Sequence, residues 1–200
     1  LKTPLKREIQ SSQIHTYKIS ASANQFFFLT VEQKGVDVAL NLFDGDVKVT
    51  ESNLPKSSSG LEIFSFVAEK AGEYRLEIKS VNQGNYQIEL REARPAVEAD
   101  KLWISATKSF AENLKLQNLQ NPNDLPKIAE NYRKILSDWQ KSADEIGEAL
   151  TLQQLGQTLN SSGDIKEAVE YYNKALNIWQ NLKIETEIAN ALNMRCYANY

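Results

Sequence analysis

Apolar and polar residues alternate along the first half of the chain. Apolar side chains recur at every second position within short runs, and Gly, Asn, Asp or Ser residues separate the runs. This period is typical of strands that bury one face. The connections are too short for the helical crossovers of a parallel sheet. The pattern therefore predicts about seven or eight strands in an antiparallel, jelly-roll-like β-sandwich over residues 1–94.

The second half of the chain, residues 95–200, has a helical period of 3.6 and contains an internal repeat. Nine residues recur 40 positions later, from Glu170 to Leu192. The first copies are Glu130, Tyr132, Lys134, Leu136, Trp139, Gln140, Glu145, Ala149 and Leu152. Such a period indicates stacked helical pairs. We expect about five helices, at residues 96–120, 125–141, 144–161, 165–181 and 185–199.

The repeat unit follows a fixed order of small and large residues: Leu152, Leu155-Gly156, Leu159, Gly163-Asp164, Ala168, Tyr172 and Ala175-Leu176. In this order it resembles the tetratricopeptide repeat (TPR), an α–α superhelix. Gly156 and Ala168 would let two helices approach closely, and Tyr172 would fill the space between successive pairs. Gly163-Asp164 would form the turn and cap the next helix. The resemblance implies that residues 95–200 are TPR-like and incomplete at the C-terminus.

The first half of the chain carries a second resemblance. Its marks are His15-x-Tyr17-x-Ile19, the run from Phe27 to Val38, and two Gly-x-Tyr-x-aliphatic-x-aliphatic strands. Over residues 6–94 these resemble the bacterial pre-peptidase C-terminal (PPC) β-sandwich, in the version that precedes TPRs in CHAT-domain (caspase-like) proteins. The resemblance implies a CHAT peptidase-like domain downstream. It also implies an exported protein (periplasmic or extracellular) with its signal peptide removed, the alternative being a cytoplasmic one.

The charge and the rare residues argue against several function classes. With 23 basic and 26 acidic residues, the net charge of −3 gives no polybasic surface for nucleic acid. No run approaches the ~18 apolar residues of a membrane span. One histidine and one cysteine leave little material for a catalytic or metal site. We therefore expect a non-enzymatic chain without cofactor or metal.

A few residues call for a choice between a structural and a functional interpretation. We expect His15 to make a local hydrogen bond and Cys196 to be a buried thiol. Asp37, Asp44 and Asp46 flank a hairpin, where turn chemistry is favoured over a calcium site.

Phe26 and Phe28 make both faces of their strand apolar. We expect a loop or the first helix to cover the outer face, and the alternative is a partner-binding patch.

The TPR resemblance implies that the first helix of each pair lines a concave groove. In the helix at 144–161, amide side chains at i, i+4 and i+7 share one face. Adding the repeat length gives the equivalent face at 185–199. The candidate partner-binding residues are Gln153, Gln157, Asn160, Asn193, Tyr197 and Tyr200.

These features favour a scaffold module that binds a protein or peptide through the TPR groove. Two alternatives remain open. The chain could be the regulatory or substrate-recruiting arm of a larger CHAT-type protease, or its sandwich could bind carbohydrate or matrix. The open end of the repeat array could also pair two copies of the chain into a homodimer.

Overall fold

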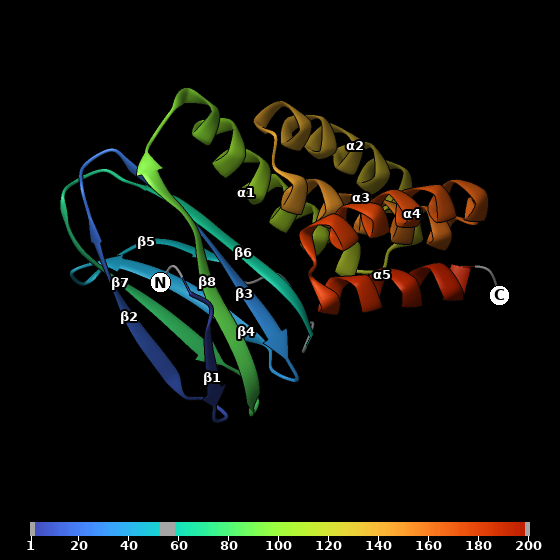
Figure 1. Ribbon diagram of the computed structural model, residues 1–200. Helices are drawn as coiled ribbons and strands as arrows, with labels where there is room; N and C mark the ends of the chain where they lie inside the picture. Colours follow the sequence, from blue (N-terminus) through green and yellow to red (C-terminus); the bar gives the residue numbers. More distant parts are fainter. Residues whose placement is uncertain (1–2, 53–58, 199–200) are drawn as a thin grey trace. The chain divides into compact units, whose positions relative to one another are not determined.

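The computed structural model describes residues 3–52 and 59–198. Its contacts divide the chain into two compact units, Leu1–Ile104 and Ser105–Tyr200. Antiparallel strands build the first unit, and helices build the second (Figure 1). The predicted fold class, a β-sandwich followed by a helical repeat, is confirmed. The boundary expected between residues 94 and 95 stays a prediction.

The first unit is a sandwich of two four-stranded antiparallel sheets. One sheet has the order β1-β8-β3-β6, and the other has the order β2-β7-β4-β5. The strands are β1 (Leu5–Ile9), β2 (Ile14–Ala21), β3 (Gln25–Lys34), β4 (Val38–Asp44), β5 (Val47–Ser52), β6 (Ser59–Ala68), β7 (Gly72–Ser80) and β8 (Gly84–Pro95). Each sheet contributes its apolar face to one core, as the period-two alternation predicted.

The two glycine–tyrosine strands of the sequence are β7 and β8, and each buries its tyrosine in this core. The Tyr74 hydroxyl donates to the Lys70 carbonyl at 3.1 Å. The Tyr86 hydroxyl instead meets side chains of β2, which belongs to the opposite sheet. Equivalent tyrosines thus satisfy their hydroxyl groups in different ways, one within its own turn and one across the sandwich.

The outer face of β3 is covered by the start of α1 (Glu98–Asn118). The Trp103 ring packs against Phe26 and Phe28, with ring centroids 4.7 and 4.3 Å away. All three side chains are buried. The expectation that the first helix covers these phenylalanines is confirmed, and the alternative of a partner-binding patch is removed.

An ion pair fixes the beginning of α1 against β8. Arg94 binds Asp100 through two hydrogen bonds of 2.8 and 2.7 Å, and its guanidinium stacks on Phe26 at 4.6 Å. Asp100 also accepts from the Val97 N–H at 2.7 Å, which satisfies a free donor at the helix start. Burial alone would raise the pKa of Asp100, but the Arg94 and Val97 hydrogen bonds outweigh it and hold the pKa below its usual range.

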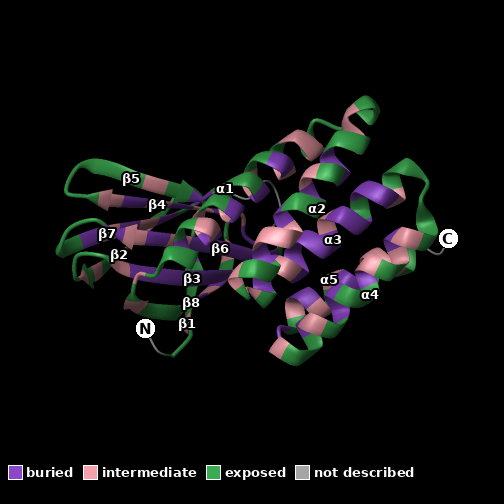
Figure 2. Ribbon diagram, turned by 90° about the horizontal axis from the view of Figure 1, so that it is seen from above, coloured by how far each residue is buried: buried purple, intermediate pink, exposed green. Residues whose placement is uncertain are grey.

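The second unit contains the rest of α1 and four further helices. A short 3₁₀ turn, η1 (Pro122–Asp124), leads into α2 (Leu125–Ser142). The remaining helices are α3 (Glu145–Ser162), α4 (Ile165–Leu182) and α5 (Glu185–Ala198). The five helices predicted from the sequence are confirmed, with ends that differ by one or two residues. Because α3 packs between α2 and α4, it is buried along most of its length (Figure 2).

Left-handed residues end three of these helices. Ala143, Gly163 and Lys183 have φ values of 55°, 89° and 56°. Each lies in the same place of its turn, so the chain reverses in the same way after α2, α3 and α4. Among the aspartates that follow, Asp144 accepts from the Ile146 and Gly147 N–H groups as an N-cap. Asp164 occupies the N-cap position of α4 without a side-chain hydrogen bond, so the capping part of that prediction is wrong.

The pair α3–α4 is closely packed because Gly156 has no side chain. A Cβ at Gly156 would lie 2.8 Å from the Tyr172 ring and 3.2 Å from the Ala168 carbonyl oxygen. Tyr172 is buried, and burial raises the pKa of its hydroxyl to about 12. The predicted close approach of these two helices is present. Tyr172 lies within this pair, against Gly156, and that it fills the space between successive pairs stays a prediction.

The repeated tryptophans find different hydrogen-bond partners. Trp139 Nε1 donates to Thr151 Oγ1 at 3.0 Å. The residue 40 positions after Thr151 is Ala191, which offers no side-chain acceptor. Trp179 Nε1 therefore donates to Gln153 Oε1, a residue of α3. The Gln153 amide in turn donates to Glu187 Oε2 at 3.3 Å, so one buried side chain joins α3, α4 and α5.

Replacing Asp100 by Asn should destabilise the first unit by about 1 kcal/mol at neutral pH, because the uncharged amide weakens the bonds from Arg94 and Val97. Since the folded pKa of Asp100 lies below the unfolded value, the carboxylate stabilises the fold above the unfolded pKa. That contribution disappears as the pH falls through the folded pKa. Urea unfolding at several pH values should therefore show the two proteins converging in acid. An equal difference at all pH values would contradict this role.

Replacing Gly156 by Ala should destabilise the second unit, although alanine favours helices by about 1 kcal/mol. The added methyl group meets the buried Tyr172 ring, and overpacking of this kind costs about 1–3 kcal/mol. Urea unfolding followed by circular dichroism at the helical band measures the difference. Ser161→Ala, at an exposed position of the same helix, is the control and should change stability by less than about 0.5 kcal/mol. A Gly156→Ala protein as stable as the control would contradict the packing argument.

Candidate functional site

The face predicted from the sequence lies on α3 and α5, two helices that contact each other. Gln157 is exposed on α3 and Asn160 is half-buried there. Asn193 is exposed on α5, and Tyr197 is 80% exposed. We call these four residues the amide–tyrosine face, and their role as one contact surface stays a prediction. Tyr200 lies outside the residues that the structure describes.

Gln153 departs from this predicted face because it is buried. Its carbonyl oxygen accepts from Trp179 and its amide donates to Glu187, so both ends of the side chain serve helix packing. The i, i+4, i+7 spacing placed Gln153 on the face of Gln157, but that spacing could not show that Trp179 needs an acceptor. We therefore leave Gln153 out of the proposed contact surface.

His15 lies in a hydrogen-bonded cluster inside the first unit. Its Nδ1 is 2.7 Å from the Tyr86 hydroxyl, which is also 2.5 Å from the Tyr17 hydroxyl. Burial and the neighbouring Tyr17 raise the pKa of Tyr86 above its usual range. The cluster ties β2 to β8 and therefore joins the two sheets. The expected structural role of His15 is confirmed, although its hydrogen bond is made across the sandwich, to Tyr86, rather than to a local partner.

The three aspartates considered for calcium do not come together. Asp37 precedes β4 and Asp44 ends it, so a strand of Val38–Asp44 separates them. At ~3.3 Å per residue the seven steps from Asp37 to Asp44 span about 23 Å. Asp44 and Asp46 are exposed beside the turn at Gly45, where φ is 58°. This local geometry fits the turn interpretation.

Cys196 is exposed, so the expectation of a buried thiol is wrong. The residue aligned with it one repeat earlier is Gly156, which α4 covers. The described part of α5 carries no such covering helix, and Leu192, one turn earlier, is also exposed. Burial of this position depends on a following helix rather than on the residue itself.

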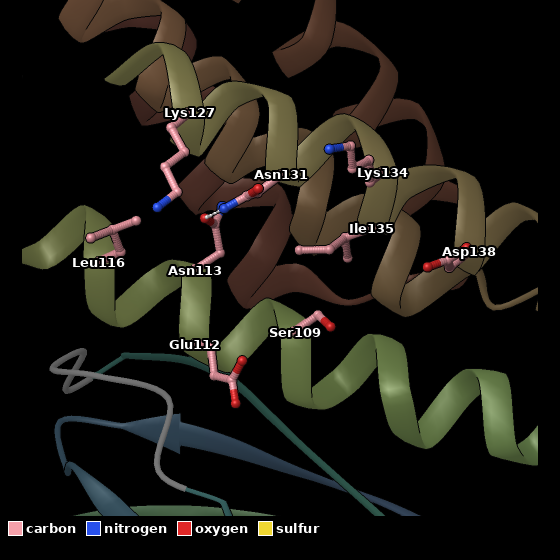
Figure 3. A pocket seen from close by; sticks show the side chains of 9 residues that line it. All are labelled: Ser109, Glu112, Asn113, Leu116, Lys127, Asn131, Lys134, Ile135 and Asp138. Carbon is pink, nitrogen blue, oxygen red and sulfur yellow. Dashed lines mark hydrogen bonds between the residues drawn. The ribbon is translucent and has the colours of Figure 1, made fainter. Parts of the chain in front are cut away.

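A groove that we did not expect from the sequence lies between α1 and α2 (Figure 3). It has a volume of about 330 Å³. Leu116 and Ile135 give it apolar walls, and Asn113 and Asn131 meet across it. The other lining residues are polar or charged: Ser109, Glu112, Lys127, Lys134 and Asp138. We call this the α1–α2 groove.

The groove exists because Asn113 holds the two helices apart. Asn113 is buried, and its Nδ2 donates to the Ile128 carbonyl oxygen at 3.0 Å. Ile128 is the residue aligned with Ala168, whose carbonyl lies against Gly156. Asn113 thus occupies in α1–α2 the place that Gly156 occupies in α3–α4. A side chain in that place separates the helices, whereas glycine lets them close.

Further polar contacts join α1 and α2 beside Asn113. Asn131 Nδ2 donates to Asn113 Oδ1 at 2.9 Å, and the Tyr132 hydroxyl donates to Gln117 Oε1 at 2.6 Å. Burial raises the pKa of Tyr132 above its usual range, so the hydroxyl stays protonated and remains a donor. The bottom of the groove is therefore a fixed, hydrogen-bonded layer.

The charges around the groove differ in whether they are already paired. Lys134 binds Glu130 at 2.6 Å, and this contact lowers the pKa of Glu130. Asp138 lies 3.4 Å from Lys141. Over residues 3–52 and 59–198, no ion pair or hydrogen bond engages Lys127 or Glu112. Figure 3 shows Lys127 extending from α2 toward α1, near Leu116.

Residues 3–52 and 59–198 also bear on metal binding and membrane crossing. They contain no group of three or more His, Cys, Asp or Glu side chains arranged to hold a metal ion. None of the helices in that part of the chain is long and apolar enough to cross a membrane.

Comparisons with known proteins agree with the helical repeat. Among the curated proteins, none matches this chain. Of the solved structures, PliG of Aeromonas hydrophila, a periplasmic inhibitor of g-type lysozyme, is 10% identical with a TM-score of 0.33, covering 44% of this chain and 85% of its own. The pre-peptidase C-terminal domain of a Bacillus anthracis collagenase is 17% identical with a TM-score of 0.34, covering 46% and 90%. Residues 123–181 match the family of the tetratricopeptide repeat.

Proposed function

We propose that the chain is a non-catalytic interaction module that binds a protein or peptide through its helical repeats. The observation that carries the proposal is the TPR match over residues 123–181, a type of repeat that indicates protein interaction and is generally non-catalytic. The exposed residues of α3 and α5 support it. Their amides and the Tyr197 ring offer hydrogen bonds and contact area to a peptide backbone.

The contact surface in this proposal is the amide–tyrosine face. Gln157 and Tyr197 occupy equivalent positions in successive repeats, since 40 residues separate them. An extended partner that lies across α3 and α5 would meet an amide first and an aromatic ring next. Tyrosine is among the residues that most often dominate binding energy, because it has a large area and few rotatable bonds.

A narrower function rests on the order of the two units. In the proteins that the sequence resembles, a PPC-like sandwich and TPRs precede a CHAT domain. On that basis we propose that the module recruits a substrate or regulator for a CHAT-type protease. The sequence of the parent gene tests this, since a downstream domain with a His/Cys pair supports it and a parent without such a domain rejects it.

The proposal predicts that Gln157→Ala combined with Tyr197→Ala weakens partner binding by about tenfold or more, with little effect on stability. Both side chains are exposed, so their removal leaves the core intact. Affinity capture with the full chain, followed by titration of the captured partner, measures the loss. Asn177→Ala with Gln180→Ala, at exposed positions of α4, is the matched control. If the doubly substituted protein captures the same partners with the same affinity, the amide–tyrosine face is not the binding surface.

A further inference from the structure

The α1–α2 groove has three features that a polar crevice on a helical surface need not have. Its bottom is a fixed pair of amides, Asn113 and Asn131, rather than mobile side chains. Its walls include the apolar side chains Leu116 and Ile135. One end carries Lys127, a cation with no hydrogen bond or ion pair to the described residues. Together these features give the groove a fixed shape, an apolar lining and a charged end.

The size of the groove limits what it can hold. A volume of about 330 Å³ is close to the lower end of small-molecule sites, which range over about 300–1,000 Å³. It suits one or two amino-acid side chains better than a nucleotide or a large cofactor. Because the groove runs between two long helices, a peptide can lie along it and place a side chain over the Asn113–Asn131 pair, with Leu116 on one side and Ile135 on the other (Figure 3).

The amide groups of Asn113 and Asn131 determine which hydrogen bonds a peptide backbone can form in the groove. Asn113 uses both its amide nitrogen and its oxygen inside the protein. Asn131 uses its amide nitrogen on Asn113, and among the described residues nothing donates to its carbonyl oxygen. That oxygen can accept a backbone N–H from a peptide in the groove.

The charged side chains that line the groove indicate which kind of peptide side chain would be attracted there. Lys134 forms an ion pair with Glu130, and Asp138 forms one with Lys141. Because these four charges are already paired, they attract a charged ligand only weakly. Two lining charges, Lys127 and Glu112, lack such a partner in the described structure. Lys127 stands beside Leu116, whereas Glu112 points away from α2 (Figure 3). An acidic side chain beside Lys127 gains attraction without breaking an existing pair.

We infer that the α1–α2 groove is a second binding site, which takes an extended peptide segment of a partner protein. In that segment an apolar residue lies between Leu116 and Ile135, and an acidic residue adjacent to it pairs with Lys127. This inference rests on the proposed interaction function and adds a surface separate from the amide–tyrosine face. An apolar residue beside an acidic one is the recognition rule.

Peptide display on the full chain tests the rule directly. A random peptide library is selected on the unaltered protein and counter-selected on the Lys127→Glu variant. We expect the enriched peptides to share an apolar residue next to Asp or Glu. Enrichment without an acidic position, or no enrichment that depends on Lys127, overturns the inference.

A charge exchange then tests the pairing. The consensus peptide, labelled for fluorescence anisotropy, should bind Lys127→Glu about fivefold to tenfold more weakly, because an exposed attraction becomes a repulsion. The same peptide with Lys in place of its acidic residue should regain affinity for Lys127→Glu. Lys108→Glu, an exposed residue of α1 outside the groove lining, is the matched control and should change neither affinity.

The outcome also separates this inference from the proposed function. Peptide binding that is lost in the Gln157→Ala, Tyr197→Ala protein but unaffected by Lys127→Glu overturns the groove inference and leaves the amide–tyrosine face as the binding surface. Binding that follows Lys127 and not Gln157 or Tyr197 establishes the groove as a separate site.

Discussion

How closely two paired helices approach depends on the residue at one position between them. At Gly156 the pair α3–α4 closes until the Tyr172 ring and the Ala168 carbonyl lie against the glycine. At Asn113 the pair α1–α2 stays open, because the amide occupies that space and binds the Ile128 carbonyl. The same helical pattern therefore gives a packed pair in one repeat and a groove in the other. The α1–α2 groove follows from this difference.

The period-two and period-3.6 patterns were enough to predict the fold, because both record which side chains are buried. Tyr74 and Tyr86 alternate with polar neighbours on half-buried strands, and each tyrosine is buried. Trp139 and Trp179 recur with the helical repeat, and both are buried. The sequence alone also indicated that Phe26 needed a cover on the outer face of β3, which Trp103 provides. In each case burial of a large side chain constrains the chain strongly enough to be visible in its spacing.

The α1–α2 groove could not be predicted in this way. The 40-residue repeat aligns α2 with α4, but the longer turn before α2, which contains η1, shifts α1 out of that register. From Asn113 to Gly156 the offset is 43 residues, so a search at 40 does not pair them. The sequence does contain an indication of the groove, because Asn113 occupies a position that is glycine, Gly156, in the next repeat. Finding it requires knowing that Ile128 and Ala168 both present a carbonyl to this position.

Gln153 and Cys196 show a different limitation of sequence patterns. Each residue lies on the helix that was predicted, but whether its side chain is buried or exposed was predicted wrongly. Gln153 lies on the expected helix, but Ala191 cannot accept from Trp179, so the glutamine turns inward to do so. Cys196 takes the place of a glycine that a neighbouring helix covers, yet it is exposed. In both cases the packing of other helices sets the environment. For Gln153 the deciding residue is Trp179 of α4, 26 positions away, and for Cys196 no helix among the described residues covers this face of α5. A surface in a repeat protein is therefore defined by which of its polar side chains the packing leaves unused. On that criterion Gln157, Tyr197 and Lys127 remain available, and Gln153 does not.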